Sequence, residues 1–213
     1  YLPHRMDEGY GLSLEAAANC LKKFPASLLL AVDCGSTAVA TIQWLRERAV
    51  DVIVVDHHQV SSPAPEAVAL VNPQLTPSAP DAAPHAKPFT ELCSVGLAFK
   101  LAHALVKRAR ETNLPGAADF DLRPLLDLVA LGTIADLVPL TGENRILVSA
   151  GLDRLRETTR PGLIALKEVA QVGDEVGAYE VGFQLGPRLN AAGRRSEEHT
   201  SELQSRLHLV CRL

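Results

Sequence analysis

The first third of the chain alternates short apolar runs with polar turns, a pattern that predicts parallel strands joined by helices. Leu28–Val32 is apolar, and Thr37–Ala49 after it carries apolar residues at the three- and four-residue spacing of a helix. Val50–Val55 is β-branched and almost wholly apolar, as expected for a strand buried on both faces. Ala67–Val71 is a third candidate strand. We therefore expect βαβ units, in which ligands bind outside the carboxyl ends of the strands.

Helical periodicity dominates the chain after a proline-rich stretch. Seven of the 14 prolines lie between residues 61 and 88, which predicts loops around the short third strand. Helical spacing follows in the segments Cys93–Thr112, Leu122–Leu131, Asn144–Glu157 and Arg160–Val172, with breaks expected at Gly132, Gly142 and Pro161-Gly162. The predicted class is α/β: a parallel sheet with helices on both faces, followed by a mostly helical segment.

Composition narrows the class of protein further. The apolar share of 47% allows a sizeable core, and no apolar run reaches the 18 or more residues of a membrane span, so we expect no membrane partner. The net charge of −4 gives no overall basic footprint, so any contact with a polyanion must be local. The four cysteines form no C-x-x-C pair, which favours free thiols and the cytoplasm. An arginine count of 15 against six lysines is typical of a GC-rich bacterial genome.

The last 19 residues differ from the body. Arg195–Ser205 has no apolar period, and its codons can spell a common sequencing-library adapter. We expect residues 195–213 to be a non-native tail, the alternative being a polar C-terminal helix. The body, residues 1–194, is then a single domain.

Chemistry-bearing residues follow the first two predicted strands. Asp33 comes directly after the first strand, and Asp56, His57 and His58 come directly after the second. Carboxylate oxygens and neutral imidazole nitrogens bind divalent metals, and paired strands lie about 4.8 Å apart. The sequence therefore predicts a metal site here, although the histidines taken alone could equally be polar turn residues.

Three further stretches are candidates. Asp136 stands among apolar residues, where a buried lone carboxylate would be costly unless it is paired or bound to metal; a helix cap or an ion pair is the structural alternative. The stretch Gly186–Arg194 combines small residues with two arginines that could clamp a phosphate, or it is an ordinary loop with solvated arginines. Near the start, Arg5 and Tyr10 suit phosphate contact and base stacking.

Four motifs together carry a family resemblance. They occur in the order VDCG (Val32–Gly35), VDHH (Val55–His58), GTIADLVPL (Gly132–Leu140) and GPRLNAAGR (Gly186–Arg194). This set resembles the DHH family of phosphoesterases, and the last two motifs resemble its branch of single-stranded-DNA exonucleases. The resemblance implies a 5′→3′ exonuclease that releases mononucleotides from single-stranded DNA in recombination and repair, with Mn²⁺ or Mg²⁺. It leaves open whether a single-strand-binding protein is a partner.

The resemblance also assigns roles to individual residues. It implies that Asp33 bridges two metals, that His57 and Asp136 are ligands, that Asp56 either ligates or orients His57, and that His58 contacts the scissile phosphate. Two-metal hydrolysis requires oxygen and imidazole ligands that hold the ions about 3.5–4 Å apart. The residues implied to contact substrate are Arg188, Asn190, Gly193 and Arg194 at the phosphate, with Arg5 and Tyr10 at the 5′ end.

The resemblance implies that residues 1–194 are a partial DHH catalytic domain, which limits what this chain is expected to do alone. The family pattern has an upstream strand that ends in D-x-D and supplies further ligands, and it has additional C-terminal domains. We expect an incomplete metal site and little nuclease activity from the 213 residues by themselves. Two alternatives stay open: a DHH phosphoesterase for short oligonucleotides or nucleotide second messengers, and a non-catalytic scaffold with the same fold.

Overall fold

The structure is a computed structural model that describes residues 1–4, 7–75 and 89–192. The chain forms two compact units, residues 1–98 and 99–213, each of which is described by itself. The predicted proline-rich loop is described as far as residue 75, and the tail from residue 195 lies outside the described ranges. No helix in these ranges has both the length and the apolar character needed to cross a membrane.

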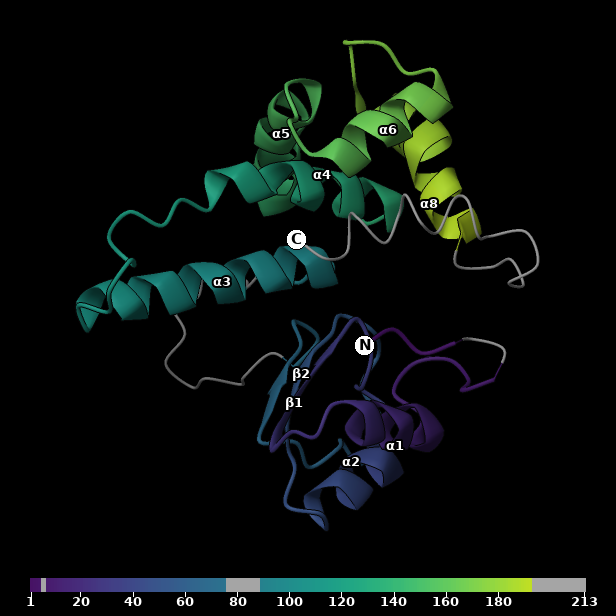
Figure 1. Ribbon diagram of the computed structural model, residues 1–213, viewed down its shortest axis with the longest axis vertical. Coiled ribbons are helices and arrows are strands. Elements are labelled where there is room, and N and C mark those ends of the chain that lie inside the picture. Colours follow the sequence, from purple (N-terminus) through teal and green to yellow (C-terminus); the bar gives the residue numbers. More distant parts are fainter. Residues whose placement is uncertain (5–6, 76–88, 193–213) are drawn as a thin grey trace. The chain divides into compact units, whose positions relative to one another are not determined.

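The first unit is built on a three-stranded parallel sheet. Its strands β1 (Leu28–Val32), β2 (Asp51–Val55) and β3 (Ala69–Val71) lie in sequence order. Two helices, α1 (Leu14–Lys23) and α2 (Val39–Arg46), pack together on one face of the sheet (Figure 1). The sequence predicted the three strands and α2 but not α1.

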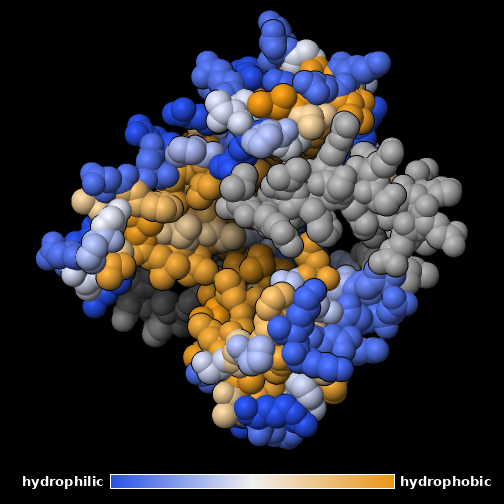
Figure 2. Space-filling view, viewed as in Figure 1, coloured by the Kyte–Doolittle hydropathy of each residue, from blue (hydrophilic) through white to orange (hydrophobic). Residues whose placement is uncertain are grey.

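A small apolar core joins those helices to the sheet. Ile42 and Leu45 of α2 contact alternate strand residues, among them Ala31 and Val54, because side chains of a strand alternate between its two faces. The β1 side chains on the other face remain largely exposed, and Figure 2 shows hydrophobic surface over the strands of this unit. The exposed β1 residues are Leu28, Leu30 and Val32.

The second unit is helical in the residues described. After α3 (Ser94–Glu111), which begins in the first unit, it contains η1 (Arg123–Leu125), α4 (Leu126–Ala135), α5 (Gly142–Arg156), α6 (Pro161–Ala170), α7 (Ala178–Glu180), the π-helical turn η2 (Val181–Leu185) and α8 (Gly186–Ala192). The predicted α/β class, a parallel sheet with helices followed by a mostly helical segment, is confirmed. Helices on both faces of the sheet were expected, but within the first unit taken by itself α1 and α2 both lie on one face.

One glycine-based prediction for this unit is wrong. Gly132 lies inside α4 rather than at a helix break, because this buried helix carries apolar side chains on all sides and their packing outweighs the effect of one glycine. Of the two interpretations of the stretch Gly186–Arg194, the ordinary loop is not found as far as residue 192, because Gly186 and Pro187 begin α8. Leu185 is buried in the core and Leu189 packs against it, so burial at a four-residue spacing stabilises the helix there.

Candidate metal centre

The carboxyl ends of β1 and β2 bring the predicted metal-binding residues together. The two strands pair in parallel with Val32 opposite Val55, so the residues that follow them leave the sheet side by side. The backbone N–H of Asp33 continues this ladder by donating to the carbonyl of Val55 at 3.0 Å. Asp33 has a φ of 64°, a left-handed conformation that is uncommon for a residue other than glycine and is found at functional sites.

Asp33, His57 and His58 form a cluster of potential ligands. One ligand atom of each lies within 4.8 Å of the other two. The Nε2 atom of His57 is 3.5 Å from Oδ1 of Asp33, and the two imidazole rings have centroids 4.4 Å apart. The Asp33 side chain is 60% exposed and that of His57 only 16%, so the carboxylate faces solvent beside a sheltered imidazole. A carboxylate with two imidazoles is a donor set suited to first-row divalent ions.

Asp56 has a different environment from the other three residues. It is 1% exposed. Its Oδ1 accepts hydrogen bonds from Nδ1 of His58 at 2.7 Å and from the backbone N–H of His57 at 2.8 Å. Its Oδ2 accepts the backbone N–H of Ser36 at 3.1 Å. Burial by itself raises the pKa of this carboxyl, but the hydrogen bonds from His58 and Ser36 outweigh burial and hold the pKa below its ordinary value.

These contacts bear on the alternatives for Asp56. The resemblance left it as a metal ligand or as the residue that orients His57. In the structure its side chain accepts hydrogen bonds from the ring of His58 and from the backbone N–H of His57. The geometry therefore favours a positioning residue for His58, while direct metal ligation by Asp56 stays a prediction.

Sequence reasoning missed two residues that support this site. Ser36 is 1% exposed, and its hydroxyl accepts the side-chain N–H of Asn72 at 2.9 Å. Asn72 also donates to the carbonyl of His58 at 2.8 Å. The signal for Asn72 was its position directly after the third strand, which matches the positions of Asp33 and Asp56 after the first two.

Two residues of the turn after Asp33, Cys34 and Gly35, are constrained by their surroundings. Gly35 has a φ of 111°, and a Cβ there would lie 3.1 Å from the side chain of Val54. Burial, followed by the charges of Asp56 and Asp33, raises the pKa of the Cys34 thiol to about 11. Cys20, Cys34 and Cys93 are free thiols, as predicted, and Cys211 lies outside the described residues.

A groove of about 510 Å³ lies beside the cluster in the first unit. Tyr10 and Asp33 both line it, and the Tyr10 ring is 73% exposed. The structure thus places the aromatic residue predicted for the 5′ end in the same groove as a predicted metal ligand. Arg5, the other residue predicted there, lies outside the described ranges.

The other predicted site residues belong to the second unit. Asp136 caps the C-terminal end of α4 and is exposed, so the expectation of a buried carboxylate is wrong. Leu137 after it has a φ of 60° and is 85% exposed, which turns the chain sharply there. Arg188 and Asn190 are exposed on α8, whereas Gly193 and Arg194 lie outside the described residues. The proposed roles of all these residues remain predictions.

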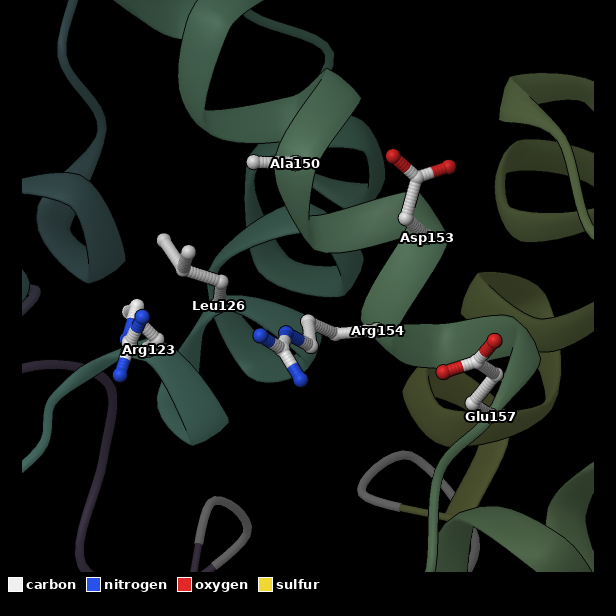
Figure 3. Close-up of a pocket in the computed structure, with 6 residues that line it drawn as sticks. All are labelled: Arg123, Leu126, Ala150, Asp153, Arg154 and Glu157. Atoms are coloured by element: carbon white, nitrogen blue, oxygen red, sulfur yellow. The ribbon is translucent and has the colours of Figure 1, made fainter.

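A further pocket of the second unit carries charges of both signs but none of the predicted residues. It has a volume of about 370 Å³, and its lining side chains are shown in Figure 3. Arg123 at its edge is bound by Asp121 at 2.9 Å, and Asp153 is bound by Arg156 at 2.6 Å. These exposed ion pairs are typical of a solvated surface, so this pocket is not a strong candidate for chemistry.

Comparison with known proteins decides the family. Residues 1–133 match the DHH family, N-terminal domain. The chain belongs to the DHH family. The matched region includes Asp33 and the Asp56-His57-His58 sequence, so the resemblance drawn from the four motifs is confirmed.

Relatives of this DHH-family chain include the single-stranded-DNA-specific exonucleases RecJ of Dickeya dadantii and Bacillus subtilis. The chain is 43% identical to the first over 198 residues and 44% identical to the second over 197 residues, in each case over 91% of its own length. It spans 33% of the first protein and 22% of the second, a third of the relatives' length or less.

Two solved structures resemble this DHH-family chain in fold. A crystal structure of exonuclease RecJ bound to manganese matches with a TM-score of 0.69 and 34% identity, covering all of this chain and 52% of the other. RecJ of Thermus thermophilus in complex with Mn²⁺ matches with a TM-score of 0.67 and 36% identity, over 92% of this chain and 26% of the other.

Proposed function

We propose that this protein hydrolyses phosphodiester bonds of single-stranded DNA from the 5′ end, with Mn²⁺ or Mg²⁺ held at the ends of β1 and β2, in DNA recombination and repair. The observation that carries the proposal is the convergence of Asp33, His57 and His58 within 4.8 Å. The similarity to RecJ proteins, which are named for single-stranded DNA and are solved with manganese, supports the substrate and the metal.

The donor set fits the proposed ions. Asp33 offers an exposed carboxylate, and His57 a sheltered imidazole nitrogen 3.5 Å from it, so a cation could bind both after small side-chain movements. Two bound divalent ions would activate water and stabilise charge at the phosphorus in an in-line displacement. Asp136 is proposed as a further ligand from the second unit.

His58 is proposed to contact the scissile phosphate. Its Nδ1 is held by Asp56 at 2.7 Å, which fixes the orientation of the ring. With Nδ1 held by Asp56, the other ring nitrogen, Nε2, is the atom that would contact a phosphate oxygen. Asp56 in this scheme positions His58 and does not touch substrate.

Substrate contacts are proposed at both units. Tyr10 lines the groove beside Asp33 and would stack on the base at the 5′ end. Arg188 and Asn190 on α8 would contact phosphate oxygens, since both are exposed polar side chains. The resemblance alone assigns Gly193 and Arg194 to the same phosphate contacts, and Arg5 to the 5′ end beside Tyr10.

The first test is metal binding, measured by titrating Mn²⁺ into the chain and following the heat of binding. We expect Asp33→Asn and His57→Ala to weaken Mn²⁺ binding about tenfold or more, because each removes a ligand. Asp51→Asn is the matched control, since Asp51 is an exposed carboxylate at the opposite end of β2. Equal Mn²⁺ affinity in all four proteins would contradict the proposal.

The second test is hydrolysis. The resemblance predicts low activity for the chain alone, so nucleotide release from a 5′-phosphorylated single strand is compared with that of Asp33→Asn at high protein concentration. We expect a Mn²⁺-dependent excess over the variant on single strands and none on blunt duplex. An excess confined to dinucleotides would favour the short-oligonucleotide alternative.

A further inference from the structure

Two aromatic side chains of the second unit face solvent as a pair. Tyr179 and Phe183 are 63% and 71% exposed, and their ring centroids lie 4.9 Å apart with an angle of 31° between the ring planes. The two rings form a small exposed apolar patch, and covering both of them would be favourable.

The fold holds this pair outward. Tyr179 belongs to α7 and Phe183 to the π-helical turn η2, and the intervening Val181 is fully buried, as is Leu185 after them. These two aliphatic side chains anchor the opposite face in the core of the unit, so the aromatic face cannot rotate inward. Single π-helical turns within helices are found frequently at functional sites.

The same helical segment continues to a cation suited to phosphate. Arg188 follows Phe183 by five residues, a rise of roughly 7 Å along a helix. It is exposed, and among the described residues its guanidinium donates only to the carbonyl of Gln184, at 2.7 Å. The acidic residue of the segment, Glu180, is engaged by the backbone N–H of Gly177 at 2.8 Å.

We propose that Tyr179 and Phe183 form a stacking platform for the bases of single-stranded DNA, with Arg188 binding the adjacent phosphate. Exposed aromatic rings beside a cation are the arrangement by which proteins bind single strands without reading their sequence. The stacked pair offers a ring face to a base, and Arg188 supplies an exposed cation for a phosphate farther along the same helical segment. This inference rests on the proposed function and assigns a DNA contact outside the metal centre.

The test compares two labelled 20-mers in EDTA, oligothymidine and an abasic strand with the same phosphates, by fluorescence anisotropy. The chain is expected to prefer the strand with bases, and Tyr179→Leu/Phe183→Leu is expected to lose that preference by about tenfold or more while binding the abasic strand unchanged. Tyr179→Phe/Phe183→Tyr should retain it because both rings remain. Phe120→Leu is the matched control, being an exposed phenylalanine outside the segment.

The result that would overturn the inference is equal binding of both strands by the parent chain, or an unchanged preference in the leucine variant. The alternative occupant of this surface is a second copy of the chain, and sedimentation analysis tests for it. If the leucine variant lost self-association while its DNA binding stayed unchanged, the surface would be a protein contact and the proposal would be wrong. Mn²⁺ affinity measured on the same proteins reports on the metal centre separately. Failure of the stacking proposal would therefore show in the DNA-binding data, and failure of the proposed metal site would show in the Mn²⁺ affinity.

Discussion

At the scale of single residues, Asp56 shows how a buried carboxylate can serve a site that it does not face. Both of its oxygens accept hydrogen bonds from the protein, and Ser36, His57 and His58 are the donors. A buried charge of this kind is tolerated because the hydrogen bonds replace those lost to water. The same bonds fix the backbone and ring positions of the residues that form the proposed metal site.

We therefore predict that Asp56→Asn disturbs metal binding. The asparagine amide would point its NH₂ group at N–H groups that also donate, so some of the hydrogen bonds that fix the site would be lost. Mn²⁺ affinity should then fall 10- to 100-fold, the usual effect of removing a hydrogen-bond partner of a metal ligand. Asp127→Asn is the control, because Asp127 is equally buried but pairs with Arg160 in the second unit. It should lower the Tm without changing Mn²⁺ affinity. Parallel losses of Mn²⁺ affinity in both variants would argue for a merely structural role of Asp56.

A second prediction at this scale concerns pH. The hydroxyl of Tyr1 and the side chain of Asn19 donate to Glu8, and these bonds hold the pKa of Glu8 below 4.5. Because the folded pKa is the lower one, the stabilisation is fully present above pH 4.5 and is lost as the pH falls through the folded value. Glu8→Gln should lower the Tm at pH 7, and the difference from the parent should shrink below pH 4.5.

The control for that experiment is Glu175→Gln, which changes an exposed carboxylate of the second unit. Thermal unfolding at several pH values should show little effect of this variant. A Tm difference for Glu8→Gln that stayed constant from pH 7 to pH 3 would show that Glu8 does not act through its charge.

At the scale of elements, the close crossing of α4 and α5 is the clearest packing constraint. A Cβ at Gly151 of α5 would lie 2.2 Å from the carbonyl oxygen of Leu126 and 2.6 Å from the Cβ of Ala130. The two helix backbones can approach this closely only because residue 151 has no side chain. Position 151 therefore requires glycine because of the contact with α4, and not because of its own backbone conformation.

Gly151→Ala is accordingly predicted to destabilise the protein by about 1–3 kcal/mol, the usual cost of overpacking a core. Gly173→Ala is the matched control, because a Cβ there would meet nothing within 4 Å. Urea unfolding followed by circular dichroism measures both. A Gly151→Ala variant as stable as the parent would show that α4 and α5 can separate without cost.

Some elements were predictable from the chain and others were not. β1 begins and ends as predicted, because five apolar residues between polar turns leave few other structures. α1 was missed although Ser13 accepts the backbone N–H of Ala16 as its N-cap. Gly132 was expected to interrupt a helix, but burial against neighbouring helices outweighs its weak helix propensity.

At the scale of the whole molecule, the charge distribution limits how DNA can bind. The net charge of −4 provides no general attraction for a polyanion, so binding must depend on a few local cations such as Arg188. Few phosphate contacts mean few released counterions and a weak dependence of affinity on salt. This behaviour would differ from that of a protein with a broad basic surface.

We expect the affinity for oligothymidine in EDTA to fall with salt with a logarithmic slope of about −2, or shallower, as for three or fewer phosphate contacts. Arg188→Gln should make the slope shallower by about 0.7, the contribution of one contact to a single strand. Arg108→Gln is the control, since Arg108 is exposed on α3 and pairs with Glu111. A parent slope steeper than about −5, or equal changes in both variants, would contradict this picture.

The sequence by itself determined the parallel strands and the residues that follow them. Asp33 and Asp56-His57-His58 could be placed at one edge of the sheet because apolar runs give the strands, and parallel strands end on the same side. That step needs only local pattern and one rule of topology. The motifs of the DHH family added the expected roles.

Only the tertiary structure decided which atoms meet. It paired Asp56 with the ring of His58, brought Ser36 and Asn72 into the support of the site, and exposed Asp136. It also turned Tyr179 and Phe183 outward as a pair. Side-chain partners and burial depend on residues far apart in the chain packing together, and a local pattern of apolar and polar positions carries no record of those contacts.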